Sequence, residues 1–335
     1  MKTPIKYARK HTYRNWSGAV GFFWKNRIAF GLTVFFILLL LPAFRPQLSS
    51  DITIIHQQPS FYGELIIFDF KKSIRCLLIE GTLQSCWNNR VQGAASVATQ
   101  YLRASLLARP DAKRILILGM GAETITKEWE KRFGLNLPFT VDIVDIDPVV
   151  PELNRRFFNY QDTEQKNIII QDARYFLAHT VEKYDIVIVD IGLGYPTVPH
   201  LTTVEMFQLV KERLNPDGII TLHWTSNIKH PDPFLKSFVK TLSQVFSNVK
   251  LTAQFPGSAK LDASGPVIIY ASDGPIERRF FRDQIKELED LSYDDSTIVF
   301  TDDFMPVDTL VGDAIIEEHK SLIKNFGEGL FLRQL

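Results

Sequence analysis

The chain has 335 residues, of which 45% are hydrophobic and 23% are charged. This composition is typical of a globular protein with one large α/β core and a short additional domain, and it excludes a disordered or fibrous chain. The formal net charge is zero. A protein that neutralises many phosphates is therefore excluded, and we expect no nucleic-acid partner.

Residues 1–27 form a basic leader without acidic side chains, and the uncharged apolar run at residues 28–44 follows directly. That run approaches the roughly 20 residues that a helix needs to cross a membrane. A cleaved signal peptide is the main alternative, although its charged leader would be unusually long. The pattern predicts a signal anchor, a single transmembrane helix. By the positive-inside rule the leader is cytoplasmic, and the rest of the chain, with any catalytic domain, lies on the non-cytoplasmic side.

Residues 51–89 predict a small N-terminal antiparallel β-domain, because apolar stretches such as ELIIFDF and RCLLIEG alternate with Lys and Gly. The domain contains both cysteines of the chain, Cys76 and Cys86, which excludes a zinc framework built on cysteine. A hairpin that turns at Gly81 would place the two cysteines opposite each other, close enough for a disulfide. Two buried free thiols are an equally supported alternative.

Residues 90–311 predict a second, larger domain in which strands and helices alternate. Its strands are near-continuous apolar runs, as expected when helices cover both faces of a sheet; they are RILILGM, TVDIVDI, NIIIQDA, YDIVIVDI and GIITLHW. Helical patterns of suitable length separate them, which favours parallel βαβ units. We therefore expect an α/β fold with a doubly wound, Rossmann-like sheet, followed by a C-terminal helix and tail over residues 312–335.

The turn after the first strand of this sheet contains Gly119 and Gly121. A helix N-terminus in such a turn can face an anion or a polar ligand tail, although a purely structural tight turn is the alternative. Asp145 ends the second strand, where a carboxylate suits a ribose diol. Asp147 is better explained as a cap for the helix that begins near Pro148.

Asp172 follows the third strand and Asp190 follows the fourth, at the same edge of the sheet as Asp145. Three carboxylates that directly follow three apolar strands are better explained by one shared ligand site than by unrelated polar residues at the surface. Ligands bind at this edge of such sheets. Asp172 could accept a hydrogen bond from an adenine amino group, and Asp190 could hold or deprotonate an attacking amine. The histidines lack the spacing of metal ligands, so no metal is expected; His200 is expected in a loop that closes over the site.

Over about residues 54–311 the sequence resembles the spermidine/spermine synthase-like transferases, in particular their membrane-associated relatives. The most specific segments, in the order and spacing of that family, are PSFYGELIIFD, LLIEGTLQS, LGMG, DIDPVV, QDARYFL, YDIVIVD, PHLTTVEMFQLVKERLNPDGII and TDDFMPVD. The resemblance implies a β-stranded N-terminal domain packed on a class I methyltransferase-like domain. It also implies a donor, S-adenosylmethionine or its decarboxylated form, and an amine-type acceptor.

Carried over residue by residue, the resemblance assigns roles to residues that match the family's motifs. Asp145 matches the ribose-binding acid, Asp190 the catalytic acid, Asp172 and Ala173 the adenine-contacting pair, and Gln84 the glutamine after the hairpin glycine. The Gly119 to Gly121 turn would hold the amino acid tail of the donor.

Two departures from the family pattern concern acids. Ala122 and Glu123 stand in the region where aminopropyltransferases have the aspartate that holds the donor amine, and Leu193 replaces a second aspartate after the catalytic one. The leading hypothesis is a membrane-anchored transferase that moves a methyl or aminopropyl group to an amine or carboxylate acceptor. The alternative is a catalytically degenerate member that acts as a binding or interaction domain. The oligomeric state stays open, with a homodimer as one alternative.

Overall fold

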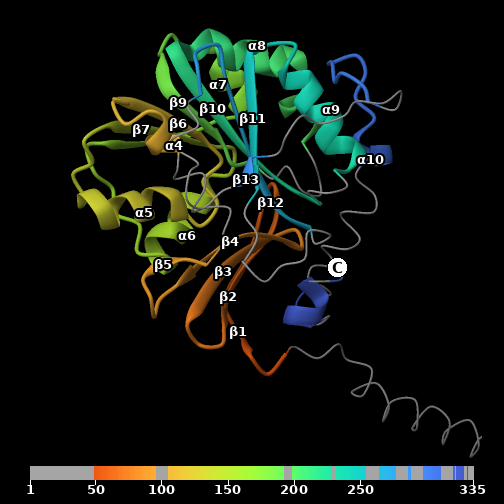
Figure 1. The fold of residues 1–335 in the computed structure, drawn as a ribbon. Helices are drawn as coiled ribbons and strands as arrows, with labels where there is room; N and C mark the ends of the chain where they lie inside the picture. Colours follow the sequence, from red (N-terminus) through yellow and green to blue (C-terminus); the bar gives the residue numbers. More distant parts are fainter. Residues whose placement is uncertain are drawn as a thin grey trace, which may run out of the picture. The chain divides into compact units, whose positions relative to one another are not determined.

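The structure is a computed structural model that describes residues 49–95, 105–191, 198–227, 231–253, 264–276, 286–287, 297–310, 320, 322–327 and 330. The chain divides into two units, and the second, Leu48–Leu335, contains all of these residues. Two sheets organise this second unit (Figure 1).

The first sheet has five antiparallel strands in the order of the sequence. They are β1 (Ile52–Ser60), β2 (Gly63–Phe70), β3 (Ile74–Ile79), β4 (Thr82–Asn88) and β5 (Gly93–Ala94). Glu80 and Gly81 join β3 to β4 with φ of 46° and 73°. Two consecutive positive φ angles match the right-handed twist of a two-residue hairpin, and glycine adopts such an angle at little cost.

The hairpin formed by β3 and β4 pairs Cys76 with Cys86, and the two residues form a disulfide with a Cα–Cα distance of 4.1 Å. Of the two alternatives that the sequence left open, the structure supports the disulfide. Both cysteines are buried among apolar side chains that include Ile66, Phe68 and Leu78.

The double substitution Cys76→Ala/Cys86→Ala is expected to lower the free energy of unfolding by about 2–3 kcal/mol, because the disulfide limits the entropy of the unfolded chain. Urea denaturation followed by circular dichroism measures the change. Reduction of the wild-type protein should give a similar loss and serves as the control. An unchanged midpoint in both experiments would contradict the expectation.

The second sheet has eight strands in the order β13-β11-β12-β10-β9-β6-β7-β8. The strands are β6 (Arg114–Leu118), β7 (Thr140–Asp145), β8 (Lys166–Ile170), β9 (Tyr184–Val189), β10 (Leu214–Asn227), β11 (Asn248–Ala253), β12 (Ser264–Ser272) and β13 (Lys286–Glu287). The pairs among β6 to β10 are parallel, and the pairs that include β12 are antiparallel. After β8 the chain returns to the far side of β6, so the strand order reverses between β6 and β9 and creates a switch point.

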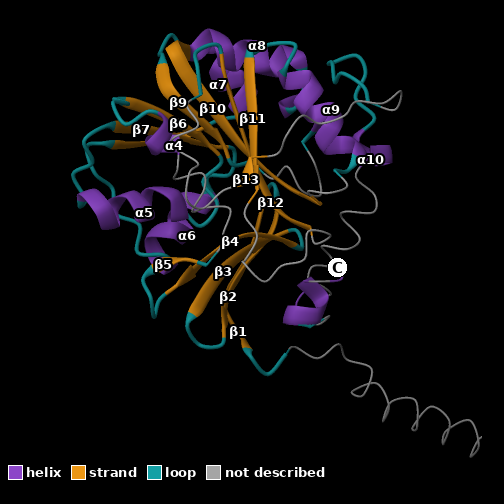
Figure 2. Cartoon of the chain, viewed as in Figure 1, coloured by secondary structure: helices purple, strands orange, loops and turns teal. Residues whose placement is uncertain are grey.

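Helices cover both faces of the second sheet (Figure 2). They are α4 (Ser105–Ala108), α5 (Thr124–Phe133), α6 (Val149–Phe157), α7 (Ala173–His179), α8 (Val204–Arg213), α9 (Pro233–Leu242) and α10 (Val307–Leu310), with a 3-10 turn, η1 (Pro199–Leu201). Helices α7, α8 and α9 share one apolar core with the sheet, while α5, α6 and the first sheet share the core on the opposite face. The predicted doubly wound α/β architecture is confirmed.

The membrane prediction is corrected. In the part of the chain that the structure describes, no helix is long and apolar enough to cross a membrane. Helices such as α5 and α9 have 10 residues, a length of about 15 Å, or half of a bilayer core. The expected anchor at residues 28–44 lies outside the described residues. The prediction depended on the hydropathy of that run and on the basic leader before it. The placement of a catalytic domain on the non-cytoplasmic side is overturned.

Candidate functional site

The glycine turn after β6 lies against the end of β9. The N–H of Gly119 donates to the carbonyl of Val144 at 2.7 Å, and the N–H of Asp190 donates to the carbonyl of Leu118 at 2.8 Å. Gly119 has a φ of 93°, and a Cβ at this position would lie 2.5 Å from the carbonyl oxygen of Asp190. Only glycine allows this approach, so the turn places the candidate catalytic residue directly beside the candidate donor loop.

The first sheet reaches the same turn through β4. The Ser85 hydroxyl accepts a hydrogen bond from the N–H of Ala122 at 2.7 Å. A Cβ at Gly121 would lie 3.1 Å from the Ser85 Oγ and 4.0 Å from the Cβ of Gln84. The structure therefore brings Gln84, predicted from the sequence, next to the glycine turn.

Asp145 at the end of β7 is tied to the turn by its carboxylate. Its Oδ2 accepts from the N–H of Met120 at 2.8 Å, and its Oδ1 accepts from the N–H of Asp147 at 2.9 Å. Burial raises the pKa of Asp145, and these two N–H groups oppose that rise. Each carboxylate oxygen can accept a further hydrogen bond, so the side chain keeps the capacity to bind a diol. Asp147 accepts from the N–H of Val149 at 2.9 Å, in agreement with its expected role at the start of a helix.

Asp172 has a structural role that the sequence analysis missed. It caps α7, because its Oδ1 accepts from the N–H of Tyr175 at 2.8 Å. The signal was present in the sequence as an aspartate directly before a helical segment. Its other oxygen lies 3.4 Å from the His200 Nε2, so the structure places His200 beside this acid. Ala173, the other predicted adenine contact, is buried.

Exposed apolar side chains lie next to these acids at the carboxyl edge. Ile146 follows Asp145 directly and is 40% exposed, and Ile170, which pairs in register with Asp145, is 46% exposed. These exposed aliphatic side chains can contact the face of a flat, largely apolar ring. The neighbouring carboxylates can accept hydrogen bonds from its polar edge.

Asp190 lies at the switch point between β6 and β9, half-buried. Burial raises its pKa to about 7. A carboxyl group with a pKa near neutrality changes its protonation state easily at physiological pH, which is the property that proton transfer requires.

An ion pair fixes the segment that carries His200. The Arg174 guanidinium donates to the Asp302 Oδ1 at 2.8 Å and to the carbonyl of His200 at 3.1 Å. Thr203 also donates to Asp302, at 2.8 Å. The guanidinium lowers the pKa of Asp302. Asp302 therefore has a structural role at the rim of the site.

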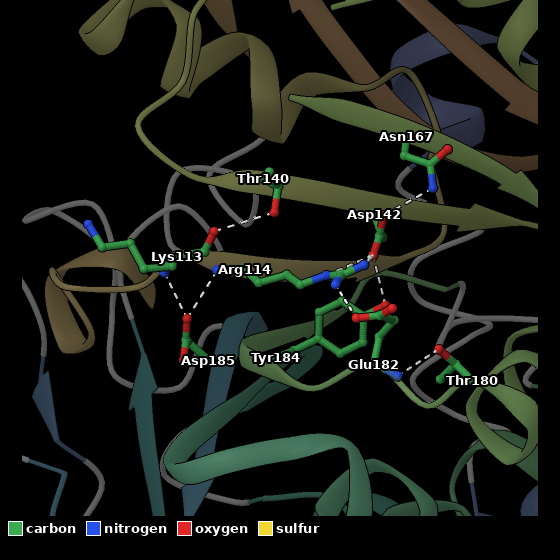
Figure 3. Close-up of polar contacts among 9 residues, drawn as sticks. All are labelled: Lys113, Arg114, Thr140, Asp142, Asn167, Thr180, Glu182, Tyr184 and Asp185. Atoms are coloured by element: carbon green, nitrogen blue, oxygen red, sulfur yellow. Dashed lines mark hydrogen bonds and ion pairs between the residues drawn. The ribbon is translucent and has the colours of Figure 1, made fainter. Parts of the chain in front are cut away.

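The opposite, amino edge of the sheet contains a second polar cluster (Figure 3). Buried Asp142 accepts from Arg114 Nη2 at 2.9 Å, from the Tyr184 hydroxyl at 2.8 Å and from the Asn167 amide at 3.1 Å. The hydrogen bonds compensate the burial of the charge. This cluster lies at the edge away from the glycine turn, and it joins β6, β7, β8 and β9.

The substitution Asp142→Asn is expected to lower the free energy of unfolding by about 1–3 kcal/mol, because the amide cannot replace the hydrogen bonds of a charged acceptor. Urea denaturation measures the loss. Asp162→Asn is the matched control: Asp162 pairs with Arg155 at the surface, where an ion pair contributes at most about 1 kcal/mol. Equal losses in the two variants would contradict the role of Asp142.

Comparisons with known proteins agree with this geometry. The family model described as spermine/spermidine synthase domain matches residues 102–256. A polyamine aminopropyltransferase of Vibrio vulnificus is 28% identical over 206 residues, which cover 58% of this chain and 67% of that protein. A putrescine N-methyltransferase 2 of Nicotiana attenuata is 25% identical over 198 residues, which cover 58% of this chain and 51% of that protein. The chain thus spans between half and two thirds of the length of these relatives.

A solved structure has a similar fold. The crystal structure of a spermidine synthase in complex with the transition state analogue AdoDATO superposes with a TM-score of 0.54 and 18% identity, over 80% of this chain and 88% of that chain. The comparisons do not support the membrane-associated branch that the sequence analysis expected. The chain is thus similar in sequence to polyamine aminopropyltransferases and contains a match to the spermine/spermidine synthase domain. The solved structure supports a Rossmann-like fold.

Proposed function

We propose that the protein is a spermidine synthase-like aminopropyltransferase that moves the aminopropyl group of decarboxylated S-adenosylmethionine to an amine acceptor. The observation that carries the proposal is the position of Asp190, whose backbone lies against the glycine turn that also binds Asp145. A relative named as a polyamine aminopropyltransferase and a structural neighbour with a transition state analogue support aminopropyl transfer. The relative named as a putrescine N-methyltransferase keeps methyl transfer as the second candidate.

The described residues fit the nucleoside part of such a donor. Asp145 retains acceptor capacity for the ribose hydroxyls after binding the two backbone N–H groups. Ile146 and Ile170 present the apolar surface for the adenine ring. Asp172 can accept from the adenine amino group through the oxygen that lies near His200. The absence of a side chain at Gly119 lets the backbone of Asp190 lie directly against the glycine turn.

The donor, when bound, supplies a carbon that is already activated by its positive sulfur, so the protein mainly aligns the two reactants. An acceptor amine is protonated at neutral pH and must lose a proton before its lone pair can attack. The carboxylate of Asp190 attracts the ammonium group and holds it at the switch point. Its raised pKa of about 7 leaves the group largely ionised only above neutral pH.

The catalytically degenerate alternative is disfavoured by the same geometry. A domain without a ligand would need Asp172 for its helix cap and Asp145 for the turn. It would have no comparable structural need for a half-buried carboxyl at residue 190. Burial raises the pKa of this group, and among the described residues no partner opposes the rise. A group that costs free energy on folding is retained more readily where it serves a reaction.

Calorimetry on the purified chain tests the proposal. We expect decarboxylated S-adenosylmethionine to bind more tightly than S-adenosylmethionine. Asp145→Ala should weaken binding by about 10- to 100-fold, the loss of one or two hydrogen bonds to a charged acceptor. Asp162→Asn, at the surface, is the control variant and should bind as the wild type does. Preferential binding of S-adenosylmethionine would favour methyl transfer, and binding of neither donor by folded protein would overturn the proposal.

A further inference from the structure

His223 lies next to Asp190 on the neighbouring strand. Strands β9 and β10 run parallel, and their last paired position joins Val189 to Leu222. Asp190 and His223 are each the next residue along their strands. Neighbouring strands in a sheet lie about 4.8 Å apart, so the two residues are side by side at the carboxyl edge.

The two side chains also point to the same face. Val189 and Leu222 both belong to the core beneath α7, α8 and α9, while Ile188 belongs to the core that the first sheet covers. Side chains alternate along a strand. Asp190 and His223 therefore both face the side of the first sheet, where Gln84 and the glycine turn meet, and both retain some solvent-accessible surface.

The surroundings of His223 contain few charges. On β12 its paired residue is Ile268, and the phenol of Tyr270 lies on the same face. Burial lowers the pKa of His223 to about 4, so its imidazole is neutral at physiological pH. It becomes basic enough to take a proton from an ammonium only beside a negative charge, which raises the pKa of the ring.

Helix α5, which packs on this face, and the residue before it contribute three buried ionisable groups that are engaged elsewhere. Glu123 accepts a hydrogen bond from Thr126, Lys127 donates to the carbonyl of Phe158 at 2.8 Å, and the Glu128 Oε1 accepts from the N–H of Ala94 at 2.7 Å. The first sheet contributes apolar residues, Leu65, Ile67 and Leu77, to this core. Asp190 is thus the carboxylate placed to interact with His223 among the described residues.

We propose that His223 is the base that removes the proton from the acceptor amine, while the Asp190 carboxylate holds the amine and stabilises the resulting imidazolium. This assignment rests on the proposed transferase function. The ammonium of the acceptor gives one proton to a ring nitrogen of His223 and becomes a neutral amine. Its lone pair then forms the new C–N bond, the C–S bond breaks, and the bonding electron pair neutralises the positive sulfur. The imidazolium finally returns its proton to solvent.

The charges favour this division of roles. An ionised Asp190 and a neutral His223 receive a cationic amine, and after proton transfer the positive charge lies on the imidazole next to the same carboxylate. A neighbouring negative charge stabilises the imidazolium, which compensates the burial that otherwise disfavours it. The carboxylate keeps its charge throughout, as in other pairs where an acid supports a histidine base.

His223→Gln tests the assignment, since glutamine can hydrogen-bond the amine but cannot take its proton. With decarboxylated S-adenosylmethionine and 1,4-diaminobutane as substrates, we expect kcat at pH 7 to fall by about 100-fold. Donor affinity, measured by calorimetry, should not change. The deficit should shrink as the pH approaches about 10, where the acceptor amine loses its proton unaided. A purely structural role would not produce this dependence on pH.

Thr225→Val is the matched control, because Thr225 lies two residues further along the same face of β10 and takes no part in the proposed site. Its kcat should equal that of the wild type. If the wild-type protein turns over and the His223→Gln variant has the same kcat, only the role of His223 is overturned. A deficit of the variant that persists at high pH would overturn that role in the same way. A folded wild-type protein that binds no donor and shows no turnover would overturn the transferase proposal, and the role of His223 with it.

Discussion

Replacing Asp190 by asparagine is expected to lower kcat by about 10²- to 10³-fold, the usual contribution of a group that stabilises charge at the reacting centre. Asparagine has nearly the same shape, so the glycine turn and the hydrogen bond from the residue 190 N–H to the Leu118 carbonyl should remain. What is lost is the negative charge that holds the ammonium of the acceptor. Steady-state kinetics with decarboxylated S-adenosylmethionine and 1,4-diaminobutane measures the effect.

The pH profile adds a separate check on Asp190. Its pKa is raised to about 7 in the folded protein. The wild-type rate should therefore increase as the pH rises through about 7, because the active carboxylate forms above this value. Asp190→Asn should lack this limb of the profile. The raised pKa also affects stability: above the ordinary pKa of an aspartate, ionisation of Asp190 disfavours the folded state. The Asp190→Asn variant should therefore be at least as stable as the wild type near pH 8. A variant with wild-type kcat would contradict the assigned role.

Gly119→Ala is expected to lower the free energy of unfolding by about 4 kcal/mol. Two effects combine: a φ of 93° is strained for alanine, and the new Cβ would lie 2.5 Å from the Asp190 carbonyl oxygen. Because the colliding atom belongs to the backbone, the end of β9 must move. A displacement of this kind also misplaces the Asp190 carboxylate, and kcat should fall by about 100-fold in protein that still folds.

Gly134→Ala separates the two effects. Gly134 has a φ of 81°, but no atom lies within 4 Å of an added Cβ. This control therefore adds backbone strain without a collision and should cost only about 1–2 kcal/mol, with normal kcat. Thermal and urea denaturation of both variants, together with kinetics, measures the difference. Equal losses in the two variants would show that the approach of Gly119 to Asp190 is unimportant.

The central sheet and its edge acids could be predicted from the sequence because parallel strands covered on both faces are continuous apolar runs. Asp145, Asp172 and Asp190 each follow such a run, and the parallel pairing brings their positions to one edge. The disulfide stayed open because it depends on the register of β3 against β4.

Other features depend on contacts between distant segments and were therefore missed. Asp142 meets Arg114 and Tyr184 only after three strands have assembled. The position of His223 beside Asp190 requires the register of β9 against β10.

The hydrogen bond from the Ala122 N–H to the Ser85 hydroxyl has a practical consequence for the design of shorter versions of the protein. A fragment trimmed to the family match, residues 102–256, would lack Ser85 and would leave a backbone donor of the glycine turn without its acceptor. It would also expose Ile125 and Trp129, which share a core with Leu65, Leu77 and Trp87. Such a fragment should aggregate, whereas one that begins near residue 49 retains this layer of apolar contacts.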